Sequence, residues 1–206
     1  MNYNNHFKTF LISKAEENIL EEIYNNFKNE FQISVKENFN INEKNFEIFS
    51  HYSEIKIISC FDITIEKQNF QIAFINLDYR FVGGKHGDSI VNENQIWGFK
   101  KLQQDYGKIL IREENYFDKI FELFNKTEID FKDDKEFSDR FFVVADHENN
   151  AKNFLNNETK KALTEIPTDE NFILEISNNE LIIGNKKPIN QLNFNQIVNF
   201  LKSNCN

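Results

Sequence analysis

The chain has 206 residues, a formal net charge of −9 and 40% hydrophobic residues, among them 23 Phe. This apolar content is enough for one packed domain or two small ones, and it excludes an intrinsically disordered chain. The excess of acidic residues makes nucleic acid a poor partner, because a phosphate backbone attracts basic surfaces.

The first predicted element is a helix over residues 14–31. Ser13 and Glu16 have the spacing of a capping box, in which each side chain accepts a hydrogen bond from the other residue's backbone N–H. Apolar residues then recur at helical intervals: Ile19, Leu20, Ile23, Phe27 and Phe31. The polar face carries glutamates, so an amphipathic core helix is favoured over a basic membrane-surface helix.

The next predicted element is an antiparallel hairpin. Residues 55–65 and 70–81 both have strand-like apolar patterns, and a turn at 66–69 separates them. The apolar alternation changes parity after Ile75. That change indicates either a bulge or a strand that is buried on both faces.

The rest of the chain alternates between strand and helix periodicities. Strands are expected at 96–102, 107–112, 141–145, 172–176 and 181–183, and helices near 115–125, at 148–164 and after Asn193. Asn193 is the expected N-cap of the last helix, with Gln196 at the capping-box position. The fold class is therefore α+β, a mainly antiparallel (mixed) sheet with four to five packed helices. We expect one domain over 1–206, with a subdivision into 1–127 and 137–203 as the alternative.

A glycine-rich segment lies at Val82–Asp88 and holds three of the six glycines. It matches neither the phosphate-binding pattern GxxxxGK[ST] nor the dinucleotide pattern GxGxxG. A glycine-rich hairpin or Ω-loop is the favoured interpretation. A ligand-binding loop formed by Gly83, Gly84, Lys85 and His86 is the alternative.

A second candidate site is Asp146-His147-Glu148, directly after the expected strand 141–145. Acidic residues are favoured at helix N-termini, so helix capping is the favoured interpretation. A histidine beside carboxylates can also act as a general base. The alternative is a hydrolase-like small-molecule enzyme in which Asp146, His147 and His86 converge on one pocket.

Motifs for metals, cofactors and membranes do not occur. The four histidines lack the spacing of zinc ligands, so we expect no metal and no cofactor. Cys60 lies in an apolar run and Cys205 beside the C-terminus, which fits a reducing compartment. The N-terminus lacks a signal-peptide pattern, and no apolar stretch is long enough to cross a bilayer. We therefore expect a cytoplasmic protein without a transmembrane segment.

Negative charge is concentrated at residues 113–148, which hold twelve acidic and five basic residues. Asp130, Asp133 and Asp134 in the linking segment 128–136 would attract a basic partner protein. The leading hypothesis is a non-enzymatic accessory or protein-binding module with an acidic face. An immunity or inhibitor protein for a basic toxin is one version of it. A structural homo-oligomer joined through the hairpin 55–81 is a further alternative.

The segment Ile129–Asp146 resembles a bacterial domain-of-unknown-function family, the one numbered 3137. In that family an acidic stretch leads to Phe-x-x-x-Phe, then Val, then Asp and an Ala-containing helix. The corresponding residues here are Phe137, Phe141, Val143, Asp146, Ala151 and Leu155. The resemblance covers the soluble part of the family, over residues 50–190. The resemblance implies that the chain shares the fold of a bacterial family without an established activity, and it supplies no catalytic residue. The chain departs from the family at His147 and Asn149 and by having no N-terminal membrane helix.

Overall fold

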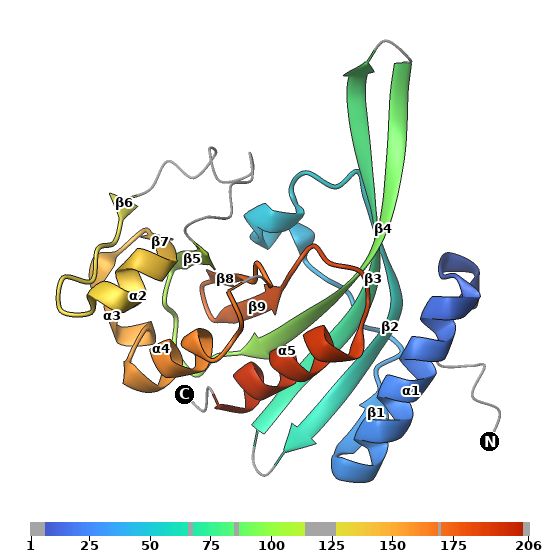
Figure 1. Cartoon of the computed structure of the whole chain (residues 1–206), viewed down its shortest axis with the longest axis horizontal. Helices are drawn as coiled ribbons and strands as arrows, with labels where there is room; N and C mark the ends of the chain where they lie inside the picture. The colour runs from blue at the N-terminus through green and yellow to red at the C-terminus, as the bar shows by residue number, and fades with distance from the viewer. Residues whose placement is uncertain (1–6, 66–67, 85–86, 114–126, 169, 204–206) are drawn as a thin grey trace.

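A computed structural model describes residues 7–65, 68–84, 87–113, 127–168 and 170–203. Nine strands of this part form one sheet: β1 (Gln32–Val35), β2 (Glu54–Ile65), β3 (Gln68–Gly84), β4 (Gly87–Lys101), β5 (Lys108–Glu113), β6 (Thr127–Glu128), β7 (Phe141–Ala145), β8 (Ile173–Ser177) and β9 (Glu180–Gly184). They are arranged in the order β1-β2-β3-β4-β9-β8-β5-β7-β6 (Figure 1). Every described pair is antiparallel, so the predicted α+β class with an antiparallel sheet is confirmed.

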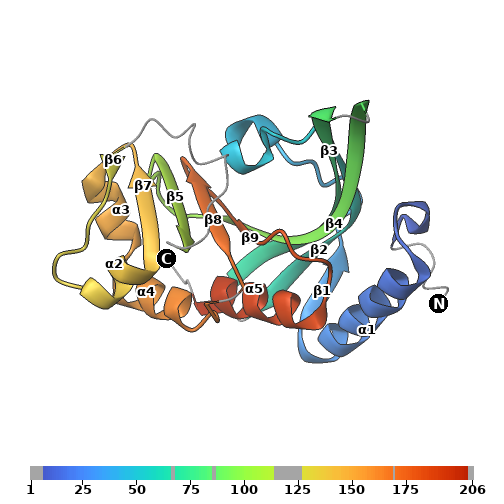
Figure 2. The ribbon, with the colours of Figure 1, turned by 45° about the horizontal axis from the view of Figure 1, so that its top comes forward.

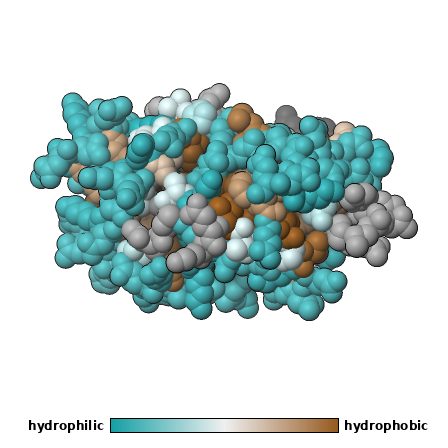
Figure 3. Space-filling model, turned by 90° about the horizontal axis from the view of Figure 1, so that it is seen from below, coloured by the Kyte–Doolittle hydropathy of each residue, from teal (hydrophilic) through white to brown (hydrophobic). Residues whose placement is uncertain are grey.

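Helices cover one face of this sheet. They are α1 (Lys14–Glu30), α2 (Lys135–Arg140), α3 (Glu148–Phe154), α4 (Asn157–Thr164) and α5 (Gln191–Ser203). All five contribute buried residues to one hydrophobic cluster with the strands (Figure 2). The opposite face is covered by residues 39–52, which include the short 3-10 helices η3 (Glu43–Asn45) and η4 (Glu47–Phe49). Seen from below, the surface is mainly hydrophilic, with hydrophobic residues gathered near its middle (Figure 3).

Strand β3 is buried on both faces, as one reading of its change in parity predicted. Phe70, Ile72 and Phe74 belong to the cluster beneath the helices, whereas Ala73, Ile75 and Leu77 belong to the opposite cluster. A register shift also occurs in the β2–β3 pair, but it lies between Ile57 and Ser59 of β2. The antiparallel pairing of β2 with β3 confirms the hairpin predicted from residues 55–81.

Helix α1 begins as the capping-box pattern predicted. The backbone N–H of Ser13 donates to Glu16 Oε2 at 2.8 Å, and that of Glu16 donates to Ser13 Oγ at 3.2 Å. Leu20, Ile23 and Phe27 form the buried face of the helix. The ring of Phe27 meets Phe194 of α5 edge-on, with ring centroids 4.3 Å apart, so α1 and α5 pack together.

Strands β4 and β5 follow each other in sequence but are not neighbours in the sheet. The β8–β9 hairpin lies between them, pairing through β9 with β4 and through β8 with β5. The linking residues also bond to the turn of this hairpin, since Tyr106 N–H donates to Asn178 O at 2.9 Å. Asn178 has a positive φ of 59°, a conformation that Asn adopts readily in tight turns.

Two helix predictions were wrong in detail. The helix expected over 148–164 is two helices, because Asn156 caps α4 by accepting from Thr159 N–H at 2.9 Å. The last helix begins before Asn193. Asn190 Oδ1 accepts from Asn193 N–H at 2.9 Å, and the Asn193 side chain is buried and donates to Asn185.

The sequence patterns did not predict β1 or α2, and the helix expected near 115–125 lies outside the described residues. Within the part of the chain that the structure describes, no helix combines the length and the apolar character needed to cross a membrane.

Candidate functional site

The predicted site at Asp146 and His147 is an exposed helix start. Asp146 N–H donates to Lys108 O at 3.0 Å, and its Oδ2 accepts from Lys108 N–H at 3.2 Å. His147 occupies the N-cap position of α3 without a capping bond from its side chain. Glu148 pairs with Lys152 at 2.6 Å, and this hydrogen bond lowers the pKa of the Glu148 carboxyl. The segment is therefore the start of a helix, but His147 at the N-cap makes no side-chain capping bond, so the structure does not show the predicted capping role there.

The glycine-rich segment forms the end of a hairpin, as its favoured interpretation predicted. Gly83 and Gly84 lie in β3, and Gly84 pairs with Gly87 of β4. Lys85 and His86 lie outside the described residues. Strands β9, β8 and β5 separate β4 from β7, which leads to Asp146. The structure therefore does not bring Gly83 and Gly84 together with Asp146.

Potential metal ligands are scattered. No group of three or more His, Cys, Asp or Glu side chains among the described residues could hold a metal ion. Cys60 is buried in β2, as expected, and burial raises the pKa of its thiol to about 12. A thiol with that pKa is a poor nucleophile at neutral pH. Cys205 lies outside the described residues.

The three aspartates of the acidic link differ from one another. Asp130 and Asp133 are exposed. Asp134 is the N-cap of α2, where it accepts from Phe137 N–H at 3.2 Å and pairs with Lys160 at 3.0 Å. The hydrogen bond from Lys160 lowers the pKa of the Asp134 carboxyl. Asp134 therefore has a structural role that the sequence reading missed, and Asp130 and Asp133 are the two available to a partner.

A projecting two-stranded arm is the most distinctive surface feature. The described pairing of β2 with β3 ends at Glu54↔Asp78, and that of β4 with β9 begins at Trp97↔Gly184. Beyond these pairs, β3 and β4 continue together and project past the other strands (Figure 1). We call this part, residues 79–84 and 87–93, the β3–β4 arm.

Three large hydrophobic side chains of the arm are exposed among those whose burial the structure describes. Tyr79 is 37% exposed, Val91 opposite it is 42% exposed, and Ile90 is 69% exposed. Phe10 and Leu192 are the other large hydrophobic residues with exposed side chains in the described part of the chain. Successive side chains of a strand point to opposite faces, so Tyr79 and Val91 lie on one face of the arm and Ile90 on the other. Exposed apolar side chains on a strand with an unpaired edge are typical of a protein-binding surface.

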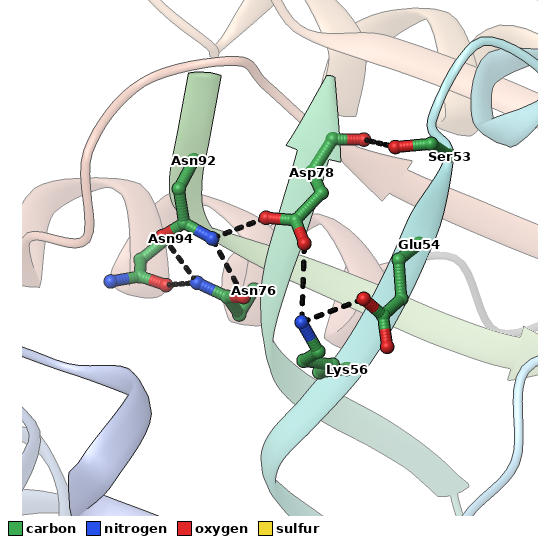
Figure 4. A network of polar contacts seen from close by, with 7 residues as sticks. All are labelled: Ser53, Glu54, Lys56, Asn76, Asp78, Asn92 and Asn94. Atoms are coloured by element: carbon green, nitrogen blue, oxygen red, sulfur yellow. Dashed lines mark hydrogen bonds and ion pairs between the residues drawn. The ribbon is translucent and has the colours of Figure 1, made fainter. Parts of the chain in front are cut away.

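A ladder of polar side chains holds the base of the arm (Figure 4). Asn76 is 1% exposed and donates to Asn92 and to Asn94, each at 2.7 Å. Asp78 continues the ladder by accepting from Asn92 and from Lys56, and these two bonds lower the pKa of its carboxyl. The ladder crosses three strands, so it fixes how β2, β3 and β4 are aligned where the arm begins.

The ladder also connects the arm to α1. Asn94 Nδ2 donates to Glu16 Oε1 at 2.9 Å, and Glu16 is the capping-box residue of that helix. At the other end, Lys56 pairs with Glu54 at 2.8 Å. The base of the arm is therefore tied both to the edge of β2 and to the first turn of α1.

A buried carboxylate holds residues 39–52, the segment that covers the face of the sheet opposite the helices. Glu175 of β8 accepts from Glu47 N–H at 2.7 Å and from Ile48 N–H at 3.0 Å. Burial raises the pKa of the Glu175 carboxyl to about 7. Glu47 itself pairs with Lys108 at 3.3 Å. This group joins η4 to the centre of the sheet.

The arm was not predicted, although its strands were predicted in part. From the sequence, the first strand is expected to end at Phe81 and the next to begin at Ile96, with a loop at 82–88 between them. The signal that could have extended the hairpin is Ile90-Val91, because β-branched residues are enriched in strands. Their exposure depends on which strands pair with β4, and that arrangement could not be read from the sequence.

Comparisons with known proteins concern only the fold. No protein-family model matches this chain, and no curated protein matches it. Among solved structures, the chain is similar to the crystal structure of the mycobacterial trehalose monomycolate transport factor A, TtfA, with 8% identity and a TM-score of 0.55. The similarity covers 93% of this chain and 95% of that one. The resemblance of residues 129–146 to the family numbered 3137 stays a prediction.

Proposed function

We propose that this protein is a non-enzymatic accessory module that binds another protein through the β3–β4 arm. The observation that carries the proposal is the arm itself, which exposes Tyr79, Ile90 and Val91 above a base held by buried polar contacts. A catalytic role at Asp146 and His147 has less support, because both residues are exposed at the start of α3 and the Asp146 carboxylate bonds to the backbone of Lys108 in β5.

The partner we infer is a basic protein that contributes an extended segment. Between Ser89 and Ile96, no described strand pairs with the outer edge of β4, so its backbone groups can bond to an added strand. Strand addition supplies affinity through backbone hydrogen bonds and specificity through side-chain contacts. The net charge of −9 favours a partner of opposite charge. An inhibitor of a basic toxin is one form of this role.

The fold comparison supports an accessory role by analogy. The similar protein is named a transport factor, and its fold extends over nearly the whole of this chain. The cargo in that name is not transferred to this chain at 8% identity. Membership of the family numbered 3137 and a cytoplasmic location also stay predictions.

The proposal is tested by site-specific photo-crosslinking in cells. A photoreactive phenylalanine analogue at Ile90 should form a covalent adduct with one basic protein. The matched control is the same analogue at Leu192, which is also exposed but lies on α5. Adducts of the same proteins from both positions, or none from Ile90, would contradict the proposal. An adduct with a second copy of the chain would replace it with homo-oligomerisation.

A further inference from the structure

A cavity of about 520 Å³ lies between the C-terminal end of α1 and the N-terminal half of α5. Its size is within the range of small-molecule sites, which is about 300–1,000 Å³. It lies on the helix-covered face, built from two helices that belong to different ends of the chain. The arm takes no part in its walls, so this cavity is independent of the proposed protein-binding surface.

Carboxamide side chains dominate the polar part of its walls. Five residues contribute them: Asn26 and Asn29 from α1, and Gln191, Asn195 and Asn199 from α5. A carboxamide offers both donors and acceptors and carries no charge. Such walls match a ligand whose own groups both donate and accept hydrogen bonds.

One of these amides has an unmet hydrogen-bonding need. Gln191 Nε2 donates to Asn195 Oδ1 at 2.7 Å. Gln191 Oε1 is buried and has no hydrogen-bond partner among the described residues. A buried acceptor without a hydrogen bond destabilises the folded protein. Because Gln191 lines the cavity, this oxygen is an acceptor for a hydroxyl group of a bound ligand.

The apolar part of the walls is formed by Phe27, Phe31 and Val198. The ring of Phe27 is held between two others, with centroid distances of 4.3 Å to Phe194 and 5.3 Å to Phe31. These contacts fix an apolar surface beside the amides. A ligand that fits the cavity therefore needs both hydroxyl groups and a C–H face.

Other ligand classes fit less well. Among the described residues, Glu30 is the one charged residue that lines the cavity, so this part of the walls offers no cation to a phosphate or carboxylate ligand. A hydrocarbon would remove the amides from water without replacing their hydrogen bonds. A single carboxylate is too few for a hard divalent cation, which takes several charged oxygen ligands.

We propose that this cavity binds a neutral polyhydroxylated ligand of the size of a mono- or disaccharide. Its hydroxyl groups pair with the five amides, and its C–H face lies on Phe27 and Phe31. Each hydroxyl, like each amide, both donates and accepts, so neither side leaves a buried polar group unpaired.

The test is a titration of the full chain with maltose and with glucose, followed by backbone amide NMR. The expected result is a saturable shift confined to residues 26–31 and 191–199. The double variant Asn195→Ala and Asn199→Ala should weaken binding about tenfold, since each lost hydrogen bond contributes about 0.5–1.5 kcal/mol. Alanine favours helix, so α5 should stay folded.

Two controls keep the test specific. Asn149→Ala, at an exposed position of α3, should leave the affinity unchanged. Glucose 6-phosphate should bind more weakly than glucose because Glu30 repels its phosphate, and Glu30→Gln should remove that difference. Shifts spread over the whole surface, no shift with either sugar, or an unchanged affinity in the double variant would overturn the proposal.

Discussion

The carboxylate of Glu175 lies 3.0 Å from the backbone nitrogen of Ile48, although 127 residues separate them in the chain. Its other oxygen accepts from the neighbouring Glu47 N–H at 2.7 Å, and the side chain is only 1% exposed. The two N–H groups favour the charged form, whereas burial opposes it and raises the pKa to about 7. The attachment of η4 to β8 is therefore sensitive to pH near neutrality.

Glu175 should make stability fall as the pH rises. The folded-state pKa of Glu175, about 7, is above the ordinary value of 4.5. The contribution of Glu175 to the free energy of unfolding is therefore fully present below pH 4.5, and it is lost as the pH rises through 7. Glu175→Gln removes this titration. Urea unfolding between about pH 5 and about pH 8 should show a shallower decline for the variant than for the wild type. Parallel declines would contradict the raised pKa.

The polar ladder should be needed for the stability of the arm's base. Asn76→Ala removes a buried side chain that bonds to both Asn92 and Asn94, and it leaves those partners without their acceptor or donor. We expect a loss of about 1–3 kcal/mol in unfolding free energy. Hydrogen exchange should also become faster at residues 88–95. Asn40→Ala, an exposed change outside the ladder, is the control, and equal effects of the two would refute the role of the ladder.

Two glycines permit close packing, and replacing them should have unequal costs. A Cβ at Gly98 would lie 2.5 Å from Ile197 Cγ2, the end of a side chain, whereas one at Gly184 would lie 2.8 Å from the backbone oxygen of Ile96. Side-chain ends can move more easily than backbone. Thermal unfolding should show losses of about 1–3 kcal/mol, larger for Gly184→Ala than for Gly98→Ala. A larger loss for Gly98→Ala than for Gly184→Ala would show that the sheet around Gly184 accommodates an added methyl group more readily than α5 does.

The aspartates of the acidic link should differ in how much they contribute to stability. Asp134→Ala should cost about 1 kcal/mol of stability because it removes the N-cap of α2 and the partner of Lys160. Asp133→Ala, at an exposed neighbouring position, should leave stability within about 0.5 kcal/mol of the wild type. Chemical denaturation measures both, and similar losses for the two variants would contradict the capping role.

Local patterns predicted most of the elements. The capping box at Ser13 and Glu16 and the hairpin from residues 55–81 depend on residues close in sequence, and both are confirmed. The change in parity after Ile75 left two alternatives, a bulge or a strand buried on both faces, and the structure shows the second for β3. The capping box and the hairpin are decided within one element or between adjacent elements, whereas the burial of β3 also depends on distant segments such as α5, where Phe194 stacks on Phe74.

Long-range pairing explains what the sequence did not reveal. The insertion of the β8–β9 hairpin between β4 and β5 depends on contacts over many residues, and no local pattern encodes it. Asn193 has the sequence features of an N-cap, but its buried bond to Asn185 fixes it inside α5, and Asn190 becomes the cap. The N-cap role of Asp134 was not predicted either, because Asp134 lies in a run of acidic residues and α2 was not expected after it.

The central claim is that the arm binds a protein partner, and one affinity comparison tests it directly. With the partner captured through Ile90 and then purified, binding is measured for the wild type, for Ile90→Asp with Val91→Asp, and for Leu192→Asp. We expect the arm variant to lose about tenfold or more in affinity, and the Leu192 variant to bind as the wild type does. Wild-type affinity in a folded arm variant would contradict the claim.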